Sequence, residues 1–441
     1  MSNENTQMPA DDTAAGPPRT VSIPFGMRLF NSFLRLLPMA AKFLLTIYMG
    51  RYYSLDDMGI YGLAFGTVII MTTVLGQRLD FIITRDIVGS PLDVTAQKIR
   101  DGVIFYGLNY LLLAFSVGLM IAFHMTQLPS EVLIYILLLS IFESMGSLFN
   151  SLMNSLNMQV KANVVFLIRG GLWVLPVIIL GVVDAKFRNY NTVLSLWAAG
   201  GGLSLFMTAW YWRKLPWHEV ISRPVDWHWI ITGVKKSFFF WLGMIGLIGG
   251  SFCDRFIIVH FLRLDYVGIL TFYSSFTNAM LTLMQSGVIV FAYPRLILLH
   301  READKAGFHH ELWRTVRQMA LGATIVCIFL GAGVPVVARM LGKTAFVTES
   351  WTFVLLLIGM WIRVNAETFF YVLFARHQDR PLWLGNLLFL LPTLGGSFIL
   401  VPLLGFSGIG YSCIISGLFL LLWRLWYIRD LIFHWRDGKV G

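Results

Sequence analysis

The sequence has little charge, little cysteine and no recognisable catalytic motif. Charged residues make up 13% of its 441 residues, and the three cysteines, Cys253, Cys327 and Cys413, all fall in apolar stretches. An odd number of cysteines without an exposed pair implies no disulfide framework. No Cys/His cluster has the spacing of a metal site, and no glycine-rich, lysine-containing phosphate loop occurs. We therefore predict no metal site and no bound cofactor.

The same absences weigh against an enzyme. A membrane glycosyltransferase or polysaccharide polymerase would need an acidic cluster or a sizeable catalytic loop at one membrane face. Asp56 and Asp57 form the only acidic pair near a predicted membrane span, and they fit better as part of an internal repeat. We therefore predict that the chain is not an enzyme.

Hydrophobic residues, in contrast, are abundant at 57%, and the mean hydropathy is +0.70. This composition indicates a polytopic membrane protein and not a soluble domain. The fold class predicted is all-α and integral to the membrane, with about twelve spans of sufficient length. Their expected ranges are 27–50, 58–79, 101–124, 131–155, 163–183, 192–212, 236–261, 266–292, 315–340, 349–374, 382–404 and 406–428.

The distribution of positive charge predicts the orientation. With the N-terminus inside, most of the 34 Lys and Arg residues, Arg424 among them, fall on the cytoplasmic side. The positive-inside rule then predicts that both termini are cytoplasmic. Residues 1–24 lack the features of a signal peptide and are expected to form a disordered tail, with a second tail at 429–441. Because the cations are spread over short loops, the net charge of +10 does not indicate a nucleic-acid partner.

Two cytoplasmic loops are longer than the rest. Residues 213–235 are expected to form an interfacial linker, because they combine three tryptophans with basic residues. Residues 294–314 mix a leucine-rich run with basic residues and are expected to include a second surface helix. Neither loop is long enough to fold as an independent domain.

An internal repeat divides the chain. The segment Leu55–Ile60 (LDDMGI) aligns with Leu264–Ile269 (LDYVGI) at an offset of 209 residues. We predict an N-terminal half at 25–212 and a C-terminal half at 236–428, each with six spans. Because six is an even number, both halves enter the membrane in the same orientation. They should be related by an axis along the membrane normal, with a transport path between them.

Charged residues inside the spans are the candidates for function. Arg28, Arg35 and Lys42 are seven residues apart in the first span, so they share one helical face. Such cations are costly in lipid and should face water, an anion or protein partners. Arg28 can instead extend to the membrane surface, and the others can form structural ion pairs. The candidate substrate-binding residues are Arg35, Lys42, Arg255, Arg169, Arg363, Asn31 and Asn150.

The few acids within the spans are candidates for coupling to an ion. Burial can raise the pKa of a carboxyl group, so Asp254, Glu143 or Glu367 could bind H⁺ or Na⁺. Structural alternatives remain open for the same groups. Glu367 lies one helical turn after Arg363 and could neutralise it. Asp254 could pair across the two halves with Lys42 or Arg35.

At this point the sequence resembles a known family. The run Gly50–Tyr61, Arg85–Asp86 after the second span, and Asp254–Ile258 followed by Val267–Ile269 resemble the Wzx-type O-antigen and exopolysaccharide flippases. These belong to the MOP superfamily with the MATE exporters and the lipid II flippases. The resemblance covers roughly residues 25–428, and the two spans that lipid II flippases typically add are missing here.

The resemblance implies a V-shaped, alternating-access transporter of two six-helix halves with a cationic central cavity. Its substrate would be an undecaprenyl-pyrophosphate-linked oligosaccharide, moved from the inner to the outer leaflet of the bacterial cytoplasmic membrane. The implied partners are this lipid-linked oligosaccharide, membrane lipids, and a polysaccharide polymerase and export proteins. The alternative is a MATE-like exporter of small molecules, coupled to a cation gradient, which would need an anionic cavity instead.

Overall fold

A computed structural model of the chain describes the backbone of residues 25–125 and 128–433 and the side chains of 33–125 and 128–431. Within these ranges twelve helices are long and apolar enough to cross a membrane. Those of the first half are α1 (Phe25–Tyr52), α2 (Leu55–Gly76), α4 (Leu92–Ala122), α5 (Ser130–Ser155), the continuous run α6, η1 and α7 (Gln159–Val183), and α8 (Tyr190–Trp212). Those of the second half are α10 (Trp227–Phe252), α12 to α13 (Leu264–Arg301), α14 (Lys305–Leu341), α16 (Ser350–Ala375), α17 to α18 (Asp379–Leu404) and α19 (Ser407–Tyr427).

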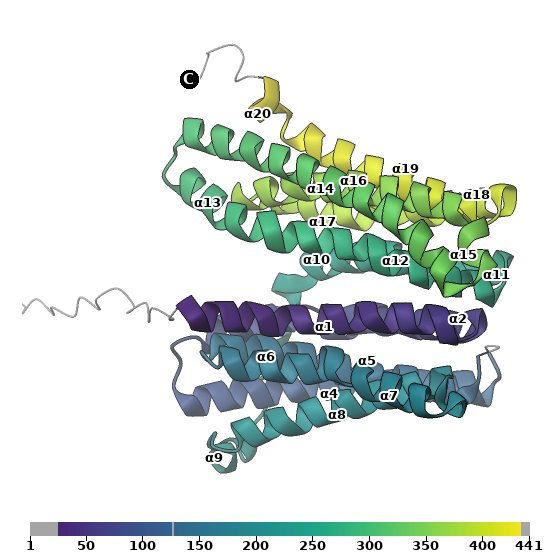
Figure 1. Cartoon of the computed structure of the whole chain (residues 1–441). Coiled ribbons are helices and arrows are strands. Elements are labelled where there is room, and N and C mark those ends of the chain that lie inside the picture. The colour runs from purple at the N-terminus through teal and green to yellow at the C-terminus, as the bar shows by residue number, and fades with distance from the viewer. Residues whose placement is uncertain (1–24, 126–127, 434–441) are drawn as a thin grey trace, which may run out of the picture.

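The expected fold class is confirmed. Figure 1 shows two helical bundles, one from each half of the chain, that diverge toward the end where α1 begins and α20 (Arg429–Phe433) ends. We call this the terminal end of the molecule, and the opposite one the far end. The expected tail at 1–24 and most of the one at 429–441 lie outside the described residues.

Many hydroxyl side chains within the helices donate to a backbone carbonyl one turn earlier in the same helix. Thr67 donates to the carbonyl of Leu63 at 2.8 Å, and Ser416 donates to that of Ser412 at 2.6 Å. In a membrane every polar group needs such an internal partner, because lipid offers none. These residues are therefore compatible with spanning helices despite their polarity.

Several expected boundaries are wrong. The seventh span begins nine residues earlier than predicted, because α10 starts at Trp227, inside the expected linker, and a break at Cys253 separates it from α11 (Asp254–Phe261). No separate surface helix occupies 294–314. The helices on either side extend through it, so that only residues 302–304 connect α13 to α14. Long amphipathic ends continue a helix beyond the bilayer, which apolar run length alone does not reveal.

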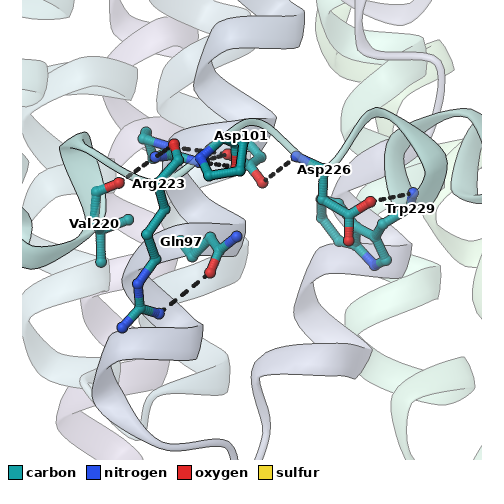
Figure 2. Close-up of polar contacts among 8 residues, drawn as sticks. Gln97, Asp101, Val220, Arg223, Asp226 and Trp229 are labelled. Carbon is teal, nitrogen blue, oxygen red and sulfur yellow. Dashed lines mark hydrogen bonds and ion pairs between the residues drawn. The ribbon is translucent and has the colours of Figure 1, made fainter.

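The linker is fixed to the N-terminal half. Arg100 on α4 donates to the carbonyls of Val220, Arg223 (2.7 Å) and Pro224 (3.1 Å). Asp101 beside it accepts from the backbone of Asp226 at 3.1 Å. Figure 2 shows this set of contacts, together with the hydrogen bond from Arg223 to Gln97. Residues 213–226, which join the halves, are therefore bound to α4 and do not form a free loop. We call this segment the strap.

A second contact holds the start of α10. Asp86, on the short helix α3 (Leu79–Ile87), accepts from the indole of Trp229 at 2.8 Å and pairs with Lys98 at 3.1 Å. Burial disfavours the charge of this carboxylate, but the hydrogen bonds from Trp229 and Lys98 outweigh it and hold the pKa of Asp86 below its ordinary value. The carboxylate thereby connects α3, α4 and α10.

The two copies of the internal repeat meet at the far end. A Cβ on Gly59 would lie 2.4 Å from the carbonyl of Leu264, and one on Gly268 would lie 2.2 Å from that of Leu55. Each glycine of one copy thus faces the first leucine of the other, as a twofold relation requires. Only glycine permits so close an approach of α2 and α12.

Candidate functional site

The first charge cluster lies within the N-terminal half. Arg169 donates to the backbone carbonyl of Glu143 at 2.7 Å and lies 3.6 Å from its carboxylate. The indole of Trp197 donates to the same carboxylate at 2.8 Å. Arg169 is 6% exposed and Glu143 is its neutralising group, so this pair connects α5 with the fifth span. Arg169 therefore forms a buried ion pair, and its contact with a substrate stays a prediction.

Lys42 lies beside this pair without joining it. Its ammonium group is 5.5 Å from the ring centre of Phe65 and 6.0 Å from that of Trp197. Glu143 and Arg169 are the charged groups whose electrostatic interaction reaches it. No carboxylate lies within ion-pair distance of Lys42 in the described part of the chain. The cluster of Lys42, Arg169 and Glu143 therefore carries one excess positive charge.

Arg35, one step further along the same face of α1, has a different neighbour. Its guanidinium donates to the side-chain oxygen of Asn163 on α6 at 3.0 Å, and the side chain of Arg35 is exposed. Like Lys42, Arg35 forms no ion pair with a carboxylate in the described residues. The side chain of Asn31, the third polar candidate on this face, lies outside the described residues.

Asn150 serves to hold helices together. Its amide donates to the carbonyl of Ala162 at 2.8 Å and accepts from Asn154 at 3.1 Å. These contacts connect α5 with α6, and interhelical amide bonds are common in membrane bundles. The role of Asn150 in substrate binding stays a prediction.

The second charge cluster lies at the start of α11. Arg255 pairs with Asp254 at 3.0 Å and donates to the hydroxyl of Ser274 at 3.2 Å. Its side chain is 3% exposed. The expected pair of Asp254 with Lys42 or Arg35 does not form. Arg255 pairs instead with Asp254, the residue directly before it. Adjacent residues of a helix point about 100° apart, so helical spacing does not predict this pair.

Arg363 on α16 lines one cavity together with Asp254 and Arg255. It forms no ion pair in the described residues. Its guanidinium stacks 5.3 Å from the ring centre of Phe389, and its buried Nε makes no hydrogen bond. The expected pair with Glu367 is also absent. Glu367 is held instead by Arg424 of α19 at 3.2 Å.

Arg424 is a buried charge that the sequence reasoning missed. It is 2% exposed and also donates to the carbonyl of Ala366 at 2.9 Å and to Asn386 at 3.2 Å. The positive-inside count placed it at the cytoplasmic surface because it lies one turn from the end of its span. Its position three residues before Tyr427 could not show that α16 and α17 cover it.

An aromatic bridge joins the two clusters across the halves. The rings of Phe65 on α2 and Phe252 on α10 are 5.9 Å apart. Lys42 lies over Phe65, and the guanidinium of Arg255 lies 4.9 Å from the ring centre of Phe252. Aromatic faces attract cations, so both charges are held close to the interface of the halves. The sequence alone offers no signal for this bridge, because Phe is common throughout it.

The structure thus separates the predicted site residues into two groups. Each of the three candidate coupling acids, Glu143, Asp254 and Glu367, is paired with an arginine. Arg35, Lys42 and Arg363 are the predicted cations that pair with no carboxylate in the described residues. The arrangement can attract an anion, and it presents no unpaired acid among the three to a cationic ligand.

The two halves are closed against each other at the far end. Arg51 on α1 donates to the carbonyl of Met340 at 2.7 Å, and Lys343 donates to that of Tyr53. Burial lowers the pKa of Lys343, and the charge of Asp57 opposes this effect. With the repeat contact of α2 and α12, these bonds seal one end of the interface.

Comparison with solved structures identifies the architecture. No family model matches the chain, and no curated protein matches it by sequence. A multidrug resistance MATE family transporter of the MOP superfamily, in an inward-facing conformation, matches with a TM-score of 0.69 and 13% identity over 92% of this chain and 100% of that chain. The lipid II flippase MurJ, in an inward closed conformation, matches with a TM-score of 0.71 and 12% identity over 94% of each chain.

The chain shares the fold of these two transporters. At such low identities the likeness concerns the fold alone, and the substrate must be argued from this chain's own residues.

Proposed function

We propose that this MOP-fold protein is a flippase for an anionic lipid-linked substrate. One observation carries the proposal: the central carboxylates are neutralised by arginines, while Lys42 and Arg35 on α1 pair with no carboxylate in the described residues. A pyrophosphate carries several negative charges, and cations within the membrane can replace its water. The substrate class that we assign is an undecaprenyl-pyrophosphate-linked oligosaccharide repeat unit, used for surface or exopolysaccharide synthesis. The chain would then act as a transporter and not as an enzyme.

Alternating access supplies the mechanism. We place the terminal end in the cytoplasm of a bacterium because the basic loops lie there. In the state described here the halves diverge toward that end and are closed at the other. Lys42 and Arg35 on α1 would receive the pyrophosphate, and the prenyl chain would remain in lipid. Rocking the halves so that the contact of α2 and α12 separates would then expose the headgroup to the outer leaflet.

The runner-up is a MATE-like exporter of small molecules. Its support is the fold, which this chain shares equally with a MATE transporter. A cationic drug would need an unpaired acid, and Glu143, Asp254 and Glu367 are all held by arginines. Binding of a cationic dye and of an isoprenyl pyrophosphate to the purified protein separates the two functions.

The test uses substitutions on α1. Lys42→Ala and Arg35→Ala should reach normal abundance in the membrane but reduce glycan export about tenfold each, since a charged hydrogen bond contributes about 1.5–3 kcal/mol. Arg35→Lys should retain part of the activity, because it keeps the charge and loses the planar fork. Lys161→Ala, an exposed cation stacked on Tyr211, is the matched control.

Export and membrane abundance are to be measured on the same variants. Normal export by a well-expressed Arg35→Ala/Lys42→Ala double variant would refute the role of α1. A structural role for these cations would appear as low abundance, with full transport by the fraction that accumulates.

A further inference from the structure

A cavity inside the C-terminal half holds positive charge that its own carboxylate does not balance. Its lining includes Asp254, Arg255 and Arg363, and its volume is about 70 Å³. The Nε atoms of both arginines are buried and have no hydrogen-bond partner. The carboxylate of Asp254 lies 3.0 Å from the guanidinium of Arg255 and neutralises it. The positive charge of Arg363 therefore remains without a counter-charge. The nearby pair of Glu367 and Arg424 is neutral in itself.

An unbalanced guanidinium within a membrane protein is costly. Arg363 has no hydrogen bond or ion pair in the described part of the structure, although its group offers five N–H donors. Its contact with the ring of Phe389 offsets only a fraction of that loss. A buried charge without a partner is among the most destabilising features of a fold. Something outside the described residues must therefore supply the missing negative charge.

The size and lining of the cavity restrict what can supply it. A water needs roughly 10–15 Å³ of such volume, so the space takes a monatomic ion with a few waters and excludes a lipid-linked sugar. Its hydroxyls offer few free donors: Ser397 donates to Ser412, which donates in turn to the carbonyl of Thr393. The available donors are the N–H groups of Arg363, the Nε–H of Arg255 and the amide of Asn278, all of which line the cavity.

We propose that this cavity is a binding site for a small monovalent anion of the size of chloride. The ion would lie at Arg363 and complete the charge balance of the C-terminal half. The site is distinct from the one proposed on α1, and the proposal does not depend on what the protein transports. It gives Arg363 a bound counter-ion in place of a contact with substrate.

The experiment measures the melting temperature of the purified full-length protein against chloride, at constant ionic strength with gluconate. Wild type should show a saturable rise in melting temperature, because a ligand that binds only the folded state stabilises it. Arg363→Gln should lose the chloride dependence. Asp254→Asn removes the competing negative charge and should shift the midpoint to lower chloride. Arg213→Gln, an exposed cation on Trp210, should behave as wild type.

Bromide provides a direct view of the site. Anomalous diffraction from crystals grown in bromide should place an ion beside the guanidinium of Arg363. A wild-type protein that melts equally in chloride and gluconate would overturn the proposal, as would an Asp254→Asn midpoint that stays or rises. If inorganic phosphate stabilises the protein as well as chloride does, the site belongs to a phosphate group and the assignment to a halide fails.

Discussion

The charged residues inside this protein fall into two groups, which their interaction partners distinguish. Arg169, Arg255 and Arg424 each hold a carboxylate and connect helices. Lys42 and Arg363 hold none in the described residues and lie against aromatic rings. The first group should matter for stability, and the second for binding.

The pair of Arg424 and Glu367 tests this distinction. Arg424→Ala should lower the free energy of unfolding by about 3–5 kcal/mol, since it leaves a buried carboxylate without its counter-charge. The double variant Arg424→Leu/Glu367→Leu should recover much of this loss, because it removes both charges at once. Thermal unfolding of the purified variants measures both effects. A single variant as stable as wild type would show that Arg424 is not a structural cation.

At the scale of elements, the strap between the halves is the feature that most changes the initial interpretation. Residues 213–226 are bonded to α4 through Arg100 and Asp101 (Figure 2). In addition, α10 is bonded to α3 through Asp86. The strap therefore moves with the N-terminal half. Any rocking of the halves must bend the chain at or after the start of α10.

Removing the central arginine of this strap should release it. Arg100→Ala loses three bonds to carbonyls, and trypsin should cut at Arg213 or Lys214 about tenfold faster, as expected for a loss of about 1.4 kcal/mol or more. Arg100→Lys should restore part of the protection, because lysine keeps the positive charge. It should not restore all of it, because lysine cannot make the forked contacts of arginine. Arg339→Ala, at an exposed position at the far end, is the control. Unchanged cleavage in Arg100→Ala would mean that the strap is held by other contacts.

For the whole molecule, the axis between the halves passes close to one pair of residues. Gly62 and Thr271 are 209 residues apart, so they are equivalent positions of the repeat, and a Cβ on Gly62 would lie 3.1 Å from that of Thr271. Equivalent residues can meet in this way only near a twofold axis. The two halves must separate here if the far end is to open.

A crosslink at this pair should stop transport. With the three native cysteines replaced, Gly62→Cys/Thr271→Cys should form a disulfide, because its Cβ separation is close to the 3.5–4.5 Å required. Oxidation should abolish glycan export and reduction should restore it. The control is Gly396→Cys/Ser412→Cys, with a Cβ separation of 3.4 Å inside one half. If the oxidised Gly62–Thr271 variant still exports glycan, the far end does not open along this line.

The sequence by itself determined the number of spans, the two-half repeat and the presence of cations within the membrane. Each of these follows from local patterns: apolar run length, a repeated segment and residue type. Only the tertiary structure decided which cations remain unpaired. Glu367 binds Arg424 of another helix instead of Arg363 one turn away, and Asp254 binds its own neighbour instead of Lys42. Ion pairing depends on how each helix is rotated and which helix it packs against, and the sequence pattern of one helix specifies neither.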